Sequence, residues 1–199
     1  WDQGRFTGEV VAVEGVDLDH DECIRRDTSA EALAGLAPAF RPGGGTVTAG
    51  NASPLADGAA ALLLAGEVVV TGTGRRPLAR IAARATSAVE PQLYGIGPVE
   101  AARKALAAAG IDWSDLVAVE LNEAFAAQVL ACLAEWPELD PALVNPNGGA
   151  VALGHPVGCT GARLITTALH ELERVDGTTG LITMCCGGGL GTGTLIERI

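Results

Sequence analysis

Apolar and polar positions along the second part of the chain follow two alternating rhythms. Beyond residue 77, short β-prone stretches are separated by longer stretches with a helical spacing of apolar residues. The predicted strands are residues 78–86, 116–121, 181–185 and 192–198. The predicted helices are residues 98–109, 123–135 and 160–175, the last of them capped by Thr160. This alternation predicts an α/β layered domain with a mixed sheet, and the glycine-rich turn 187–191 makes the last two strands an antiparallel hairpin.

The first 77 residues give a weaker pattern. Residues 9–13 have the composition of a strand, and residues 30–36 form a short helix that Ser29 caps. A hydroxyl cap at Ser53 followed by a proline predicts a helix over 55–65, and its apolar residues on nearly all sides predict that it is buried. Residues 68–71 fit either a strand or an extension of that helix, and residues 72–77 are the best candidate for a domain boundary.

Composition and charge limit the possible partners. The chain has 199 residues, of which 48% are hydrophobic and 19% charged, as in a globular protein. Its net charge of −11 argues against binding to nucleic acid. No apolar run is long enough to span a membrane, and no signal peptide is visible. The first residue is Trp1 rather than Met, so we expect a fragment, a processed product or one piece of a split protein.

The cysteines give no sign of disulfide or metal chemistry. Five are present, an odd number, and no two have the C-x-x-C spacing. No cluster of histidine and cysteine has the spacing of a zinc site, so no metal is predicted. We therefore expect all five to be free thiols in a reducing, cytoplasmic environment.

The densest candidate for chemistry is the stretch from Asn145 to Arg163, where glycines surround His155. Glycine permits positive φ and close backbone approach, and Pro156 stiffens the turn that carries the imidazole. A histidine presented in this way suits proton transfer near neutral pH. A tight loop in which His155 merely caps a neighbouring backbone group explains the same residues equally well.

Two further polar groups occur where predicted strands end. Asn122 follows the strand 116–121, where it could cap the next helix or hydrogen-bond a developing oxyanion. Cys185 ends the strand 181–185 beside a glycine run, where it could be a reactive thiol or an ordinary small buried residue. Together with His155 they form an acid–base set suited to thioester chemistry, which is a hypothesis because a sequence contains no distances.

Three stretches resemble the C-terminal motifs of the thiolase family: NEAFAAQ (122–128), NPNGGAVALGHPVGCTGAR (145–163) and MCCGGGLG (184–191). Residues 21–40, 46–53 and 95–106 are similar to further family stretches, so the resemblance covers essentially the whole chain. It implies a thiolase-like layered α-β-α half with a mixed sheet, as part of a five-layer α-β-α-β-α fold. In that fold, residues 1–54 would end the loop domain, 55–74 would end the N-terminal half, and 75–199 would form the C-terminal thiolase domain.

The resemblance implies acyl transfer to and from coenzyme A, with CoA and acyl-CoA as substrates and no further cofactor. His155 matches the histidine that activates the nucleophilic cysteine, and Cys185 matches the second cysteine, which acts as acid and base. Asn122 matches the asparagine that orients a water in one oxyanion hole, and Gly187 the glycine whose N–H lies in the other.

The resemblance also implies residues that contact the substrate. Ser53 matches a serine near the pantetheine, and Arg25 an arginine near the nucleotide end of CoA. Phe125 matches an aromatic residue beside the substrate pocket, although core packing explains it equally well. One departure is Pro54, which replaces the usual glycine after the serine.

The second departure concerns the nucleophile. In thiolases the nucleophilic cysteine lies in the N-terminal half within a Cys-Gly-rich context, which Cys23, Cys132 and Cys159 lack. We therefore expect the chain to need an N-terminal half that supplies this cysteine, in a homodimer or tetramer. A noncatalytic CoA-binding or assembly module is the alternative, and the CCGGG segment argues against a decarboxylating condensing enzyme.

Overall fold

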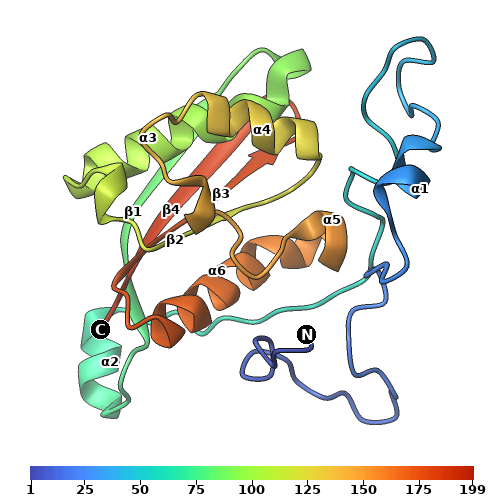
Figure 1. The fold of residues 1–199 in the computed structure, drawn as a ribbon. Coiled ribbons are helices and arrows are strands. Elements are labelled where there is room, and N and C mark those ends of the chain that lie inside the picture. Colours follow the sequence, from blue (N-terminus) through green and yellow to red (C-terminus); the bar gives the residue numbers. More distant parts are fainter.

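The computed structural model describes residues 1–199, and its centre is one four-stranded mixed sheet. Helices cover both faces of this sheet, with α3 and α4 on one side and α6 on the other (Figure 1). The strands are β1 (Ala79–Ala88), β2 (Ala118–Leu121), β3 (Thr179–Cys186) and β4 (Leu190–Arg198). They lie in the order β1-β4-β3-β2, with β2 parallel to β3 and the other pairs antiparallel. The predicted mixed sheet and terminal hairpin are therefore confirmed.

The helices that cover the sheet end and begin at local signals. Six α-helices are present: α1 (Ala30–Ala34), α2 (Glu67–Thr73), α3 (Gly97–Ala109), α4 (Ala126–Ala134), α5 (Ala150–Leu153) and α6 (Val157–Arg174). Three 3-10 turns supplement them: η1 (Pro91–Ile96), η2 (Trp113–Asp115) and η3 (Pro141–Leu143). Helix α3 stops at Gly110, whose φ of 71° is left-handed, as predicted. None of the helices has the length and apolar composition to cross a membrane.

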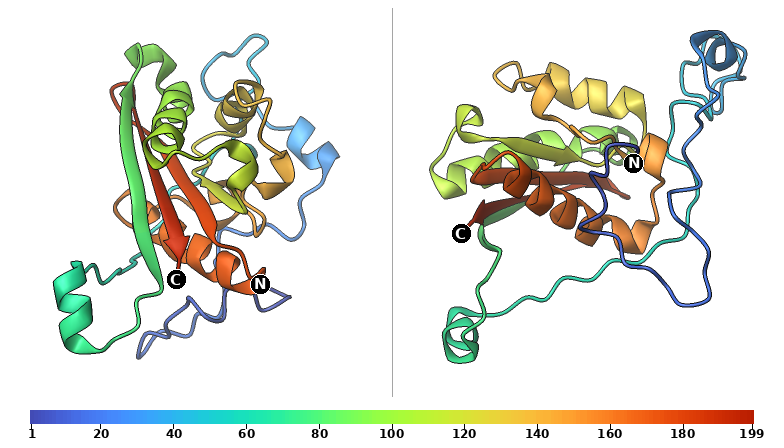
Figure 2. Two further views of the ribbon diagram at one scale, coloured as in Figure 1. Left: turned by 90° about the vertical axis from the view of Figure 1, so that its left-hand side faces the viewer. Right: turned by 60° about the horizontal axis from the view of Figure 1, so that its bottom comes forward.

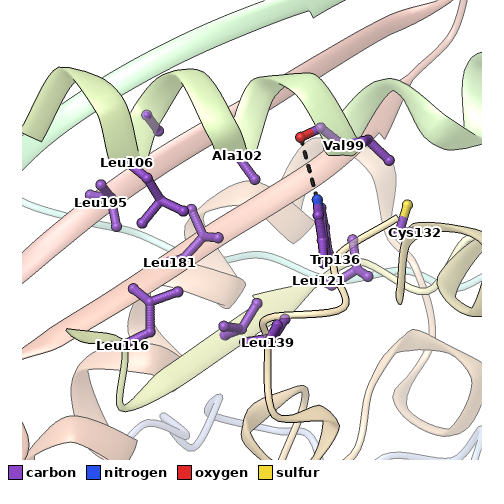
Figure 3. Close-up of a cluster of buried hydrophobic side chains, with 12 residues drawn as sticks. Val99, Ala102, Leu106, Leu116, Leu121, Cys132, Trp136, Leu139, Leu181 and Leu195 are labelled. Carbon is purple, nitrogen blue, oxygen red and sulfur yellow. Dashed lines mark hydrogen bonds between the residues drawn. The ribbon is translucent and has the colours of Figure 1, made fainter. Parts of the chain in front are cut away.

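The sheet is covered by two hydrophobic clusters, one on each face. The larger cluster lies under α3 and α4 and includes Trp136, whose indole N–H donates to the Val99 carbonyl at 3.4 Å (Figure 3). The smaller cluster lies under α6 and includes Leu164 and Leu172. Adjacent strand residues alternate between the two, because successive side chains of a strand point to opposite faces. In β3, for example, Leu181 belongs to the larger cluster and Ile182 to the smaller.

Helix α3 begins directly on the terminal hairpin, and two glycines make this contact possible. A Cβ on Gly191 would lie 2.2 Å from the carbonyl carbon of Gly97, and a Cβ on Gly97 would lie 2.6 Å from the Leu190 oxygen. Ser87 of β1 donates a hydrogen bond to the Gly97 carbonyl at 2.5 Å. The start of α3 is thereby fixed to both β1 and β4.

The N-terminal part is an extended segment that runs around the outside of the layered domain and has few buried residues (Figure 2). Neither α1 nor α2 contains a buried residue. The predicted buried helix over 55–65 is wrong, since these residues form no helix and the side chains of Leu55 and Leu63 are fully or nearly fully exposed. A short helix in water needs a surface that covers its apolar side chains. Here Ala56 and Gly58 lie against Gly154 and Pro156, but Leu55 and Leu63 remain exposed.

Three other predictions near the N-terminus have different outcomes. The predicted strand over 9–13 is wrong, because these residues pair with no other strand; Glu9 is instead bound through its side chain, which accepts a hydrogen bond from Thr167 at 2.9 Å. The open question at 68–71 is resolved as helix, since these residues lie within α2. The helix 30–36 is confirmed as α1, with Ser29 accepting a hydrogen bond from the Ala32 amide.

Two helices begin elsewhere than predicted. Helix α4 starts at Ala126 rather than at 123, because Phe125 is extended and forms an isolated antiparallel bridge with Ala52. Helix α6 starts at Val157 after Pro156, so Thr160 lies inside its first turn and is not the cap. Both differences affect residues beside the candidate site.

We predict that Leu181→Ala destabilises the fold by about 2–5 kcal/mol, because Leu181 is fully buried in the larger cluster and its truncation leaves a cavity. Urea unfolding followed by circular dichroism measures this loss. The matched control is Leu130→Ala on α4, where the side chain is 65% exposed and the expected change is within about 0.5 kcal/mol. Equal losses in the two variants would contradict the assigned core.

Candidate active site

Asn122 and His155 meet at the end of strand β2. The Asn122 Nδ2 lies 3.3 Å from the His155 Nε2, although the two residues are 33 positions apart. Asn122 is completely buried, while His155 is half-buried in the turn between α5 and α6. Asn122 is not a helix cap, because α4 starts four residues later with Phe125 at its N-cap position. The capping interpretation of Asn122 is therefore wrong, and its hydrogen bond to an oxyanion stays a prediction.

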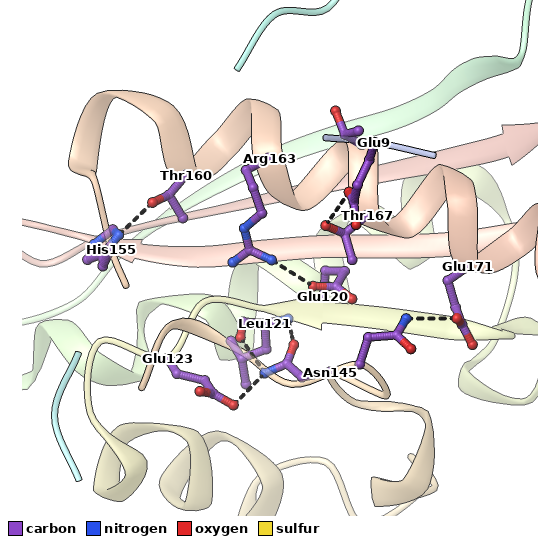
Figure 4. A network of polar contacts seen from close by, with 12 residues as sticks. Glu9, Glu120, Leu121, Glu123, Asn145, His155, Thr160, Arg163, Thr167 and Glu171 are labelled. Atoms are coloured by element: carbon purple, nitrogen blue, oxygen red, sulfur yellow. Dashed lines mark hydrogen bonds and ion pairs between the residues drawn. The ribbon is translucent and has the colours of Figure 1, made fainter. Parts of the chain in front are cut away.

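Thr160 fixes the protonation pattern of the His155 ring. Its hydroxyl donates to the Pro156 carbonyl at 3.0 Å, so toward His155 Nδ1, at 2.7 Å, it acts as an acceptor (Figure 4). His155 Nδ1 consequently carries the proton, and Nε2 presents its lone pair to the amide of Asn122. Burial lowers the pKa of His155, and the positive charge of Arg163 lowers it further. The imidazole is thus held neutral, with Nε2 ready to accept a proton.

The loop before His155 is held by side-chain hydrogen bonds to the backbone, in place of a paired strand. Asn145, at a left-handed φ of 48°, accepts from the Leu121 amide at 2.9 Å and donates to the Leu121 carbonyl at 2.8 Å. Glu123 accepts from the Asn145 amide and from the backbone N–H of Val151, each at 3.0 Å. The Glu123 carboxylate also explains Gly149, where a Cβ would lie 2.2 Å from it.

Cys185 lies at the same carboxyl edge of the sheet. Strand β3 is parallel to β2, Leu121 is opposite Thr183, and the Asn122 amide donates to the Thr183 carbonyl at 3.0 Å. Cys185 is two residues further along β3, on the side of the larger cluster, whereas Asn122 lies on the α6 side. Cys185 makes no hydrogen bond to His155. Burial raises the pKa of Cys185, and the neighbouring Cys186 raises it further, so the thiol is protonated at neutral pH.

Gly187 lies in the turn of the β3–β4 hairpin, directly after Cys186. A Cβ on Gly187 would meet no atom within 4 Å, so the space beside it is open. The next two glycines have φ of 81° and 91°, and a Cβ on Gly189 would lie 2.2 Å from the Val89 carbonyl oxygen. The glycines therefore permit a tight turn next to an accessible backbone.

The predicted substrate-contacting residues divide into two groups. The segment 51–53 pairs with the segment 124–126, and Ser53 donates through its hydroxyl and its amide to the Ala124 carbonyl, at 3.2 and 3.1 Å. Ser53 therefore lies beside the loop 122–125, which connects β2 to α4 and contains Phe125. Arg25 is exposed on the N-terminal segment, and its side chain forms no hydrogen bond or ion pair.

A groove of about 300 Å³, lined mainly by apolar side chains, opens beside Phe125. Phe40 and Phe125 meet there edge to face, with ring centroids 5.8 Å apart, and Tyr94 of η1 forms another wall. Burial raises the pKa of Tyr94, and the charge of Cys185 adds to this effect. The groove therefore lies on the Cys185 side of the sheet edge and suits an apolar part of a ligand.

Sequence reasoning missed three residues that hold the site together. Thr160 had been interpreted as a helix cap, while Asn145 and Glu123 had been assigned no role. The usable signals were the hydroxyl five residues after His155 and an asparagine, a residue that tolerates positive φ, at the start of a glycine-rich turn.

Comparison with known proteins agrees with this architecture. Residues 75–198 match the family model "Thiolase, C-terminal domain", and residues 1–68 match "Thiolase, N-terminal domain". The chain is 48% identical to a 3-ketoacyl-CoA thiolase of Shewanella sp. (strain MR-7) over 99% of its own length and 53% of that protein. A 3-ketoacyl-CoA thiolase of Aeromonas salmonicida (strain A449) is 46% identical, with the same shares covered.

Solved structures show the same similarity. The crystal structure of Bacillus anthracis acetyl-CoA acetyltransferase superposes with a TM-score of 0.92 at 44% identity, and covers all of this chain and 51% of that one. Human mitochondrial 3-ketoacyl-CoA thiolase in complex with CoA gives a TM-score of 0.92 at 40% identity, over all of this chain and 50% of that one. The chain thus spans about half the length of the relatives it matches. With this α/β fold, these motifs and this identity, the chain belongs to the thiolase family.

Proposed function

We propose that the chain is part of a thiolase-type acyltransferase, which cleaves or forms 3-oxoacyl-CoA in a CoA-dependent reaction. The observation that carries this proposal is the contact between Asn122 and the unprotonated Nε2 of His155, at the sheet edge where Cys185 also ends its strand. The names of the relatives support it, since those quoted above are 3-ketoacyl-CoA thiolases or an acetyl-CoA acetyltransferase. The enzyme would act in fatty acid β-oxidation or related lipid metabolism.

His155 has the geometry of a general base. Its Nε2 would accept the proton of a nucleophilic cysteine thiol, and the thiolate would then attack the 3-oxo carbon of the substrate. The resulting imidazolium is stabilised because its Nδ1–H already donates to Thr160. Asn122 and the backbone at Gly187 are placed to donate hydrogen bonds, directly or through water, to oxyanions.

Cys185 would act on the other half of the reaction. Its thiol donates a proton to the α-carbon of acetyl-CoA as the carbon–carbon bond breaks. Its thiolate then takes the proton of the incoming CoA thiol, whose sulfur attacks the acyl-enzyme thioester and releases the shortened acyl-CoA and the nucleophilic cysteine. A pKa raised by burial suits a group that must first be an acid at neutral pH.

The nucleophile in this scheme would come from an N-terminal thiolase half. Burial raises the pKa of Cys132 to about 11 and also raises that of Cys159, so neither thiol is activated. The exposed leucines and valines around 55–69 give this half an apolar surface to cover. In this arrangement residues 1–54 belong to the loop domain, 55–74 complete the N-terminal half, and 75–199 form the C-terminal domain.

Three further features belong to the proposal. Ser53 would contact the pantetheine, Phe125 the acyl part, and Arg25 the nucleotide end of CoA. The assembly would be a homodimer or tetramer, by analogy with the family. The five unpaired cysteines support a reducing, cytoplasmic location.

We predict that the chain, co-expressed with an N-terminal thiolase half, cleaves 3-oxoacyl-CoA, and that His155→Ala lowers kcat/KM by about 10²- to 10⁴-fold through loss of the general base. The rate of thiolysis is measured as the decrease in absorbance of the magnesium enolate of the substrate. The matched control is His170→Ala, because His170 lies on α6 away from the site and should leave the rate unchanged.

Full activity in His155→Ala would refute the role of this residue. If no reconstituted mixture transfers acyl groups but calorimetry shows tight CoA binding to the chain, a noncatalytic CoA-binding module is the correct function. That alternative is favoured only by the raised pKa values of Cys132 and Cys159, which leave these two thiols unactivated.

We also predict an asymmetric pH profile for kcat/KM. His155 must be neutral to act as a base, so activity falls as the pH drops through its pKa; because that pKa is lowered, the acid limb should lie below pH 6.5. Cys185 must be protonated to act as an acid, so activity falls as the pH rises through its raised pKa, above pH 9.0. Steady-state rates across this range test both signs, and an acid limb above pH 7 would contradict the assigned environment of His155.

A further inference from the structure

Strand β2 makes a second polar contact with the segment that carries His155. Glu120 lies two residues before Asn122 and therefore on the same face of the strand, and its side chain is completely buried. Its carboxylate Oε2 faces Arg163 of α6, with Nη1 at 3.5 Å (Figure 4). Two alternate residues of β2 thus meet two residues of one short segment: Asn122 meets His155, and Glu120 meets Arg163.

Stability alone does not explain the Glu120–Arg163 pair. The Oε1 of Glu120 and the Nη2 of Arg163 are both buried without a hydrogen-bond partner. Taking the guanidinium charge out of water is costly, and apolar residues of similar volume often stabilise such a position equally well or better. A buried pair with one unsatisfied atom on each side is therefore better explained by a role at the neighbouring site.

Arg163 is the charged group that acts on His155. It follows Thr160 by three residues on α6, so both side chains project from the same side of that helix, Arg163 toward Glu120 of β2 and Thr160 toward the imidazole (Figure 4). Burial disfavours a second proton on the imidazole, and the positive charge of Arg163 adds to this effect.

We propose that Arg163, held in place by Glu120, is a positioning residue for His155: it fixes the first turns of α6 against β2, and with them the Thr160 hydroxyl that holds the imidazole beside Asn122. The inference rests on the role proposed above for His155, and its test is a titration without substrate. The enzyme assay can therefore fail while the titration gives the expected result, and the titration can fail while the enzyme is active.

The other charged groups near the pair leave the charge of Arg163 effective. Burial raises the pKa of Glu120 to about 8, and the neighbouring carboxylates Glu9, Glu171 and Glu123 add to the rise, while Arg163 opposes it. Glu120 is then mostly protonated where His155 titrates and does not cancel the guanidinium charge. Glu9 is bound to Thr167, and Glu171 to Asn147 and Arg174, so both have partners of their own.

The test is the titration of the three histidines of the chain by ¹⁵N NMR, which reports both the pKa and the tautomer of each ring. We expect Arg163→Met to raise the pKa of His155, because a like charge is removed, and to weaken its preference for the Nδ1–H tautomer. Arg163→Lys keeps the charge and should return the pKa toward that of the wild type. Arg174→Met is the matched control, since Arg174 pairs with Glu171 at the far end of the same helix and should leave His155 unchanged.

An unchanged His155 titration in folded Arg163→Met would overturn the proposal, as would an equal shift in Arg163→Lys. Glu120→Gln provides a second variant of nearly the same shape if Arg163→Met does not fold. Because Glu120 is mostly neutral where His155 titrates, Glu120→Gln should leave that pKa in place. A fall in the His155 pKa would show that Glu120 had been cancelling the charge of Arg163, and would also overturn the proposal.

Discussion

Strand β2 is buried on both faces, and the arrangement of the site follows from how its polar groups are satisfied. A strand covered on both sides is normally apolar throughout, and Val119 and Leu121 obey this rule on the α3 and α4 side. Glu120 and Asn122 face α6 instead, where each needs a partner because a buried polar group without one costs about 1–3 kcal/mol. Arg163 and His155 are those partners, although Glu120 Oε1 and Asn122 Oδ1 stay without a hydrogen bond. The contacts that join α6 to the sheet therefore also place the imidazole.

The elements that could be predicted from sequence are those with local signals. The end of α3 is set by a glycine that adopts a left-handed φ, and the terminal hairpin by a glycine-rich turn between two apolar stretches. The predicted helix over 55–65 failed because a short helix needs its apolar side chains covered, and Leu55 and Leu63 remain exposed here. The start of α4 failed because Ala52, more than 70 residues away along the chain, holds Phe125 extended, and no local pattern encodes that contact.

The site could be predicted in part, because motifs identify residue types but not the faces on which they lie. Asn122, His155 and Cys185 are predicted from the sequence as one set, and the first two do meet. That Cys185 lies on the opposite side of the sheet depends on the register between β2 and β3, which the sequence does not state. Glu120 was overlooked although a glutamate inside the apolar run VAVEL is itself a signal: a charge in a buried strand implies a specific partner.

The opposite placement of His155 and Cys185 explains how two proton-transfer groups can share one edge without neutralising each other. A thiol and an imidazole in direct hydrogen-bond contact would form a thiolate–imidazolium pair, as in cysteine proteases, and neither group could then play the part proposed for it. Here burial raises the pKa of the thiol and lowers that of the imidazole, and no hydrogen bond joins them. Each group therefore keeps its neutral form, the imidazole on the α6 side and the thiol beside the apolar groove. In the proposed reaction, a substrate lying across the carboxyl edge of β2 and β3 would meet the two groups at different atoms, as cleavage of the bond between the 3-oxo carbon and the α-carbon requires.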